Sequence, residues 1–227
     1  MENLPLHIPV TFVLTTLFAV WLFYKANGNS TTTLLILVTW LVLQGLIAVS
    51  GFYTVVNTVP PRFVLLVLPP LLTIIALFAS PQGRKYIDGL DIKTLTLLHV
   101  VRVPVEVVLY WLFVHKVVPK VMTFEGNNFD IFSGLSAPLM FYFGFIKEKL
   151  GKNILLIWNF ICLALLVNIV STAVLSAPFP FQKMGFEQPN IAVLYFPFVW
   201  LPCCVVPLVL LAHLATIRRL LLAKRLI

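Results

Sequence analysis

Charged residues are scarce in this sequence. Asp, Glu, Lys and Arg make up only 11% of its 227 residues, whereas 60% are hydrophobic. A soluble domain carries roughly 25% charged residues, so the composition excludes an ordinary soluble protein and indicates an integral membrane protein. The net charge of +8 would suit nucleic acid, but the basic residues gather at the ends of apolar runs. We therefore predict a lipid bilayer as partner, and no nucleic acid.

The sequence also lacks the short motifs of soluble enzymes. It contains no HExxH, GxSxG, P-loop or GxGxxG pattern, and no Cys/His spacing typical of a metal site. Cys162, Cys203 and Cys204 all lie in apolar runs, where we expect buried, reduced thiols. The last apolar segment has no lysine for a retinal Schiff base. We predict no catalytic residue, no metal and no cofactor, and the sequence favours a protein that is not an enzyme.

Long apolar runs predict an all-α fold. At about 20 apolar residues per membrane span, the chain accommodates seven transmembrane helices, at about residues 9–24, 32–56, 63–80, 92–118, 131–146, 154–175 and 191–217. The first ten residues lack the basic region and the cleavage site of a signal peptide, so we expect the first run to be a retained span. The sequence predicts one transmembrane domain over residues 1–227, a bundle of seven helices.

The distribution of basic residues predicts how this bundle is oriented. Of 16 Lys and Arg residues, 11 fall on one side of the seven segments and four on the other, and Arg102 lies within a span. Cytoplasmic loops carry the excess of Lys and Arg. We therefore predict an outside N-terminus and a cytoplasmic C-terminus, in the inner membrane if the host is a bacterium.

The fourth apolar segment holds the main candidate site. At 100° per residue, His99, Arg102, Glu106 and Tyr110 share one narrow helix face. An arginine at the centre of a spanning helix costs about 2.5–3.5 kcal/mol on the mildest insertion scales. We expect Glu106, one turn away, to offset this cost by pairing with Arg102. The face would serve as a proton relay, an anchor for a polar or ionic ligand, or a fixed structural pair.

Further polar residues lie within or beside the apolar runs. Gln44, Asn159 and Asn168 are expected to form interhelical hydrogen bonds, and we place Asn168 near the Arg102–Glu106 pair.

The segment FEGNNFD, residues 124–130, concentrates hydrogen-bond acceptors at the expected outer mouth of the bundle. Asp130 is expected to cap the fifth helix. The others are turn residues or an entry site for a cation or polar solute. The candidate residues here are Glu125, Asn127, Asn128 and Asp130.

Two histidines suggest a different site. His99 and His213 lie six and five residues from Lys93 and Arg218, which mark the cytoplasmic ends of their helices. At 1.5 Å per residue both histidines sit roughly 8–9 Å inside those ends. Equal depth on two helices is what a b-type haem with two histidine ligands requires, and Arg102 would then face a propionate.

Three functional classes follow from these residues. The first is a small transporter or ligand-binding membrane protein with its polar centre at Arg102 and Glu106, assisted by His99, Tyr110 and Asn168. The second is a haem redox module using His99 and His213. The third is a non-catalytic subunit whose charges specify an oligomer or assembly with another membrane protein.

Overall fold

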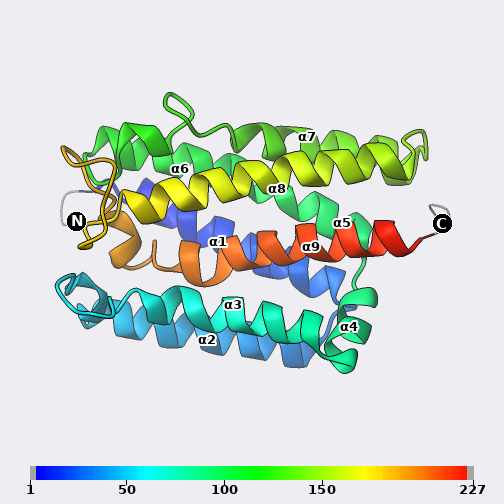
Figure 1. The fold of residues 1–227 in the computed structure, drawn as a ribbon, viewed down its shortest axis with the longest axis horizontal. Helices are drawn as coiled ribbons and strands as arrows, with labels where there is room; N and C mark the ends of the chain where they lie inside the picture. The colour runs from blue at the N-terminus through cyan, green and yellow to red at the C-terminus, as the bar shows by residue number, and fades with distance from the viewer. Residues whose placement is uncertain (1–3, 224–227) are drawn as a thin grey trace.

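The computed structural model describes residues 4–223, which form helices and no strands. Lys224 and Arg225, which contribute to the predicted charge bias, lie outside this range. Figure 1 shows the long helices side by side along one axis. The α-helices are α1 His7–Ala26, α2 Thr31–Val49, α3 Val64–Ala79, α4 Pro81–Asp88, α5 Ile92–Leu98, α6 Arg102–Val114, α7 Ile131–Phe141, α8 Lys152–Leu175 and α9 Val206–Leu222.

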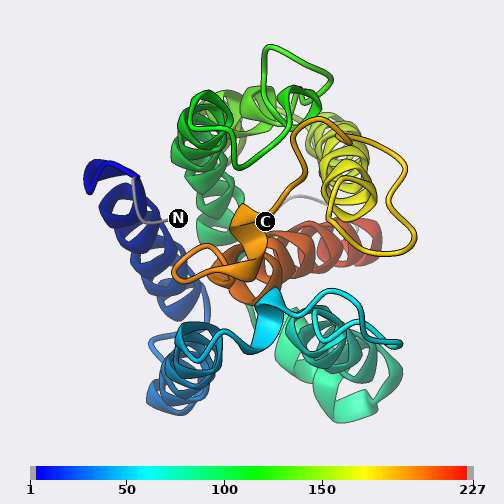
Figure 2. The same cartoon turned by 90° about the vertical axis from the view of Figure 1, so that its left-hand side faces the viewer.

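Three short helical segments extend these elements. The 3₁₀ turn η2, His99–Val101, joins α5 and α6 into one 23-residue span, Ile92–Val114. The π-helical segment η4, Tyr142–Ile146, continues α7, and a second one, η6, Leu201–Val205, leads into α9. Figure 2 shows η6 and α9 surrounded by the other helices, and α9 is the most buried of the long helices.

Within residues 4–223, five helices are long and apolar enough to cross a membrane, and a sixth span results if α3 and α4, which meet at 95°, are counted as one. Large apolar side chains exposed on the bundle suit contact with lipid tails. The fifth predicted span, residues 131–146, corresponds to Ile131–Ile146, which is shorter than the others. At 1.5 Å per residue it reaches about 24 Å, less than the hydrocarbon thickness of about 30 Å.

Three predicted spans differ from the observed helices. The fourth was expected to reach residue 118, but α6 ends at Val114. The second was expected to reach residue 56, but α2 ends at Val49, because Gly51 adopts a left-handed conformation with φ +75° and begins a turn. The seventh was expected to begin at residue 191. The helical part begins at Leu201 instead, because residues 191–200 form a 3₁₀ turn and an irregular segment containing Pro197.

Helix α7 is short because the chain before it turns back into the bundle. Gly134 in its first turn lies against Arg102 and Val103, which are near the middle of the span Ile92–Val114. In Figure 1, α7 begins near the middle of the bundle. The segment 115–130 therefore covers the distance that a full-length helix would cross, and it carries Asp130 to the depth of Arg102.

Gly134 permits this approach, and an alanine there is expected to destabilise the protein. A Cβ at this position would lie 2.9 Å from the backbone nitrogen of Val103 and 2.8 Å from its Cγ2. Overpacking of this kind costs about 1–3 kcal/mol. Thermal unfolding in detergent should show a lower Tm for Gly134→Ala. The matched control is Gly89→Ala, whose Cβ would meet only ordinary contacts. Equal Tm values for the two variants would contradict the close packing of α7 on α6.

An ion pair joins α4 to the C-terminal part of α9. The Nε of Arg218 donates to Asp88 Oδ1 at 2.9 Å, and a second guanidinium nitrogen donates to Oδ2 at 3.0 Å. Arg219 donates to the carbonyl of Asp88. The hydrogen bond from Arg218 lowers the pKa of the Asp88 carboxyl from its ordinary value, against an opposing effect of burial.

This ion pair predicts a pH dependence of stability. Because the folded-state pKa of Asp88 is lowered, its contribution is present above the unfolded pKa of about 3.9 and is lost as the pH falls through the folded value. Asp88→Asn should therefore lower Tm near neutral pH, and its difference from wild type should shrink towards about pH 3. A difference that stays constant over this titration would show that the carboxylate charge is not responsible.

Candidate functional site

Arg102 pairs with Asp130, not with Glu106 as predicted. Its Nε lies 3.2 Å from Asp130 Oδ2, and both side chains are almost fully buried. Its two terminal nitrogens each lie 3.3 Å from the carbonyl oxygen of Cys162 in α8. Asp130 occupies the N-cap position of α7, but its side chain makes no capping hydrogen bond. It turns inward, because the neighbouring cation satisfies a buried carboxylate better than the helix end does.

Glu106 is held by Asn128 instead. The amide nitrogen of Asn128 lies 2.7 and 2.6 Å from the two carboxylate oxygens, and 3.0 Å from the carbonyl of Met122. The amide oxygen of Asn128 accepts from the backbone N–H of Asp130 at 3.0 Å. One loop therefore supplies the partners of both charged residues on α6. Glu106 and Asn128 are buried, so this contact lies inside the bundle rather than at an outer mouth.

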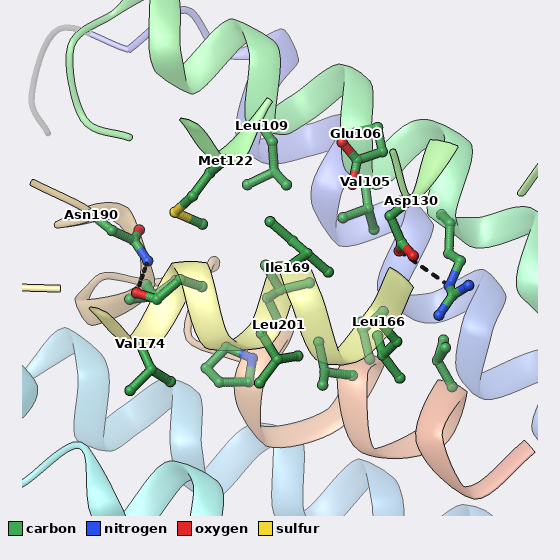
Figure 3. A pocket seen from close by; sticks show the side chains of 18 of the residues that line it. Val105, Glu106, Leu109, Met122, Asp130, Leu166, Ile169, Val174, Asn190 and Leu201 are labelled. Atoms are coloured by element: carbon green, nitrogen blue, oxygen red, sulfur yellow. Dashed lines mark hydrogen bonds and ion pairs between the residues drawn. The ribbon is translucent and has the colours of Figure 1, made fainter. Parts of the chain in front are cut away.

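A cavity of about 100 Å³ runs beside these groups. Figure 3 shows Asp130 and Glu106 near one end of it and Asn190 near the other, with Leu109, Met122 and Ile169 between them. Arg102 also lines the cavity. Its wall is otherwise largely apolar, and comes from α3, α6, α8, η6 and α9. Most of its lining residues belong to α6, α8, η6 and α9, and α3 contributes only Val67.

The polar groups on this wall are not balanced. Two carboxylates, Asp130 and Glu106, share the cavity with one guanidinium, Arg102. Asp130 Oδ1 and Asn190 Oδ1 are buried and have no hydrogen-bond partner among the described residues. The orientation of the Asn190 amide is fixed, since its nitrogen donates to the carbonyl of Ala173 at 3.2 Å. Buried acceptors without donors are costly, so these two oxygen atoms can accept hydrogen bonds from a further group in the cavity.

His99 and His213 form a second buried pair. Their rings stack with centroids 3.8 Å apart and planes 19° from parallel, and both are fully buried. His213 Nδ1 lies 2.9 Å from Asn159 Oδ1 of α8, and Trp158 packs edge-on against His99. A haem with two histidine ligands needs the iron between two imidazole nitrogens. Here the rings touch face to face, so the geometry does not fit a porphyrin and gives the haem alternative no support.

The remaining predicted residues lie away from this centre. Tyr110 is half-buried and stacks on Phe124 with ring centroids 5.0 Å apart. Asn168 was predicted to lie near the Arg102–Glu106 pair. It is exposed instead, and its amide donates to the carbonyl of Asn127 at 2.9 Å. Glu125 and Asn127 are exposed on the loop. The predicted interhelical hydrogen bond is confirmed for Asn159 of α8, which contacts His213 of α9.

Sequence reasoning missed Asn190 and the inward position of Asn128 and Asp130. Asn190 follows a proline-rich segment that reads as an ordinary loop, yet its backbone N–H donates to the carbonyl of Ser176 at 2.8 Å and its side chain is fully buried. A buried loop residue leaves no periodic pattern. In the 124–130 segment the buried Asn128 and Asp130 are polar and the exposed Phe129 is apolar, so the hydropathy pattern gave no signal of their position.

Removing one member of the Arg102–Asp130 pair is expected to be more harmful than removing both. Asp130→Asn leaves a buried guanidinium without its carboxylate, which costs about 3–5 kcal/mol. Replacing the pair by apolar residues, as in Arg102→Met with Asp130→Leu, should recover most of that loss, because no charge is then buried. Denaturant unfolding in detergent measures both. The control is Glu125→Gln, an exposed acid in the same loop, and a double variant weaker than the single one would refute the pairing.

Comparison with known proteins gives a family but no function. No curated protein and no solved structure shows significant similarity to the chain. A family model matches residues 59–221, which include η2, α6, the 124–130 loop, His213 and every residue that lines the cavity. Since the match covers more than half of the sequence, the chain belongs to the family described as a domain of unknown function (DUF8737).

Proposed function

We propose that this protein binds a small ligand with an apolar body and a cationic, hydrogen-bond-donating end, such as a protonated amine, inside the membrane. The observation that carries the proposal is the cavity whose wall has two carboxylates against one guanidinium and two buried acceptors without donors. Ionisable side chains inside membrane spans mark ligand or ion sites by default. A ligand of this kind supplies both the charge and the donors that the wall lacks.

The geometry gives each polar residue a role in this proposal. Arg102 engages Asp130 through Oδ2, which leaves Oδ1 for the ligand. Glu106, held by Asn128, places a second carboxyl group on the same wall. Arg102 thus positions a carboxylate instead of anchoring an anion, which revises the role expected from its place in the sequence. The apolar body would lie along α8 towards Asn190 (Figure 3).

Size limits the ligand. An apolar cavity of about 150 Å³ accepts benzene, so the cavity of about 100 Å³ suits a smaller body, such as that of a short alkylamine. The smallest occupant that is cationic and donates hydrogen bonds is a proton bound to one or two waters. One water takes about 30 Å³, so these waters fit in the cavity of about 100 Å³.

We further propose that all seven apolar segments lie in the bilayer, with the N-terminus outside and the C-terminus in the cytoplasm. The bias of Lys and Arg supports this orientation. The tertiary contacts support a seventh element in the membrane, because the short α7 packs on α6 with its first turn near the middle of that span. If the ligand enters the cavity from one side of the membrane and leaves towards the other, the function is transport.

Ligand-dependent stabilisation tests the binding proposal. Purified protein is heated in detergent with a series from methylamine to butylamine, and with the matching alcohols and carboxylates. The amines should raise Tm, because saturation at 100 times Kd stabilises a protein by about 2.7 kcal/mol. Glu106→Gln should abolish the shift by removing the carboxyl group that can pair with the amine, whereas the exposed Glu125→Gln should retain it.

A cavity-filling variant keeps the test independent of the charges. Ala173 lines the cavity, whereas Ala164 of the same helix is exposed. Ala173→Leu should remove the amine shift and Ala164→Leu should not. Stabilisation by carboxylates, or an amine shift that survives in Ala173→Leu, would overturn the proposed site. Uptake of the stabilising amine into proteoliposomes then separates transport from binding alone.

A further inference from the structure

A second and larger hollow lies between α2 and α3. Its volume is about 710 Å³, within the range of ligand-binding pockets. Its walls are α2 and α3, its floor comes from α9 and the adjoining Cys203 and Cys204, and it shares no lining residue with the cavity beside Asp130. We call it the α2–α3 groove.

The groove is a product of how these helices pack. Helix α2 packs against α1, η1 (Phe52–Thr54) and η6, whereas α3 packs against α4, η6 and α9, so the two walls do not close on each other. Figure 2 shows α2 and α3 as separate columns on one side of the bundle. Helix α4 turns away from α3 by 95° and places Tyr86 at the groove.

The interior of the groove suits hydrocarbon. Its lining is mainly aliphatic and aromatic, from Leu35, Ile36 and Leu43 on α2 to Ile74 and Leu77 on α3. The hydroxyl of Thr73 already donates to the carbonyl of Pro69, and the indole N–H of Trp40 donates to the carbonyl of Cys203. These polar groups are therefore satisfied within the protein and do not require a polar occupant.

Positive charge lies at one end of the groove. Lys25 is two residues from the lining residue Phe23, and Arg84 and Lys85 directly precede the lining residue Tyr86. Lys25 and Lys85 are exposed. The nearby acid Asp88 is occupied by Arg218, as described above.

Asp91, the other acid near this end, is also occupied. Its carboxylate caps α5 by accepting from the backbone N–H groups of Lys93 and Thr94. Among the described residues, the cations at this end of the groove therefore have no acidic partner, and Arg84 donates only to the carbonyls of Phe78 and Ala79.

We propose that the α2–α3 groove binds an anionic phospholipid, with an acyl chain along the groove and the phosphate at Lys25, Arg84 and Lys85. Basic pockets between transmembrane helices recognise anionic headgroups, and each Lys or Arg near the membrane surface adds to that attraction. The apolar interior accounts for the chain, and the cations without acidic partners account for the preference for a negative headgroup. This site is separate from the proposed amine site and does not depend on it.

Native mass spectrometry of the full chain in detergent tests this site. The protein is titrated with dioleoyl phosphatidylglycerol and, separately, with dioleoyl phosphatidylcholine, which has the same chains and no net charge. Phosphatidylglycerol should bind about tenfold more tightly or better, given the attraction of several cations. The double variant Arg84→Gln with Lys85→Gln should bring its affinity close to that of phosphatidylcholine.

Two matched controls separate the groove from general attraction to a basic surface. The double variant Lys147→Gln with Lys149→Gln removes two cations near the same end of the bundle, close in sequence to Lys152, which donates to the carbonyl of Ala223. This variant should leave the preference for phosphatidylglycerol unchanged. Ile36→Trp, in the groove, should weaken binding of both lipids, whereas Val38→Trp, on the same helix outside the lining, should not.

Equal affinity for the two lipids would overturn the proposal, as would an equal loss in both charge variants. Association of a second copy of the chain in place of lipid would also overturn it. The Tm of each variant, measured without added lipid, identifies any variant that fails to fold. If a charge variant does not fold, the comparison of Ile36→Trp with Val38→Trp decides whether lipid binds in the groove.

Discussion

The burial of Arg102 is the constraint on which the centre of this bundle depends. A guanidinium near the middle of a spanning helix requires a carboxylate at the same depth. The protein meets this requirement with Asp130, and to bring Asp130 there it shortens α7 and turns the preceding loop inward. The small Gly134 lets the first turn of α7 rest on α6. The short helix α7, the buried loop and the cavity beside them all follow from the need to pair the buried Arg102.

Much of this architecture follows from composition and periodicity. The membrane class, the all-helical fold and the approximate positions of the apolar segments agree with the structure, and the burial of His99, Arg102 and Glu106 follows from their shared helix face. The equal depth of His99 and His213 was also visible from the distance of each to its helix end. Periodicity predicts such positions well because it depends only on the residues of one helix.

The partners of these residues were not predictable in the same way. Glu106 is one helical turn from Arg102 and was the obvious counter-ion, yet a loop more than 20 residues further along supplies Asp130 for the arginine and Asn128 for the glutamate. Which contact wins depends on tertiary packing, which a single helix face does not contain. Asn190 was missed for the same reason, because a buried loop residue has no regular spacing. Both gaps concern contacts between elements far apart in sequence.

The depth of the charged centre has an electrical consequence. Arg102 lies ten residues from one end of the 23-residue span Ile92–Val114, so the centre is near the middle of the membrane. A transmembrane potential of 100 mV acts on one elementary charge with about 2.3 kcal/mol over the full thickness. A cation that reaches Asp130 from either side crosses roughly half of that field, worth about 1 kcal/mol. If the centre lies at mid-membrane and binds a cation as we propose, its occupancy depends on membrane voltage, and the voltage favours entry from one side over the other.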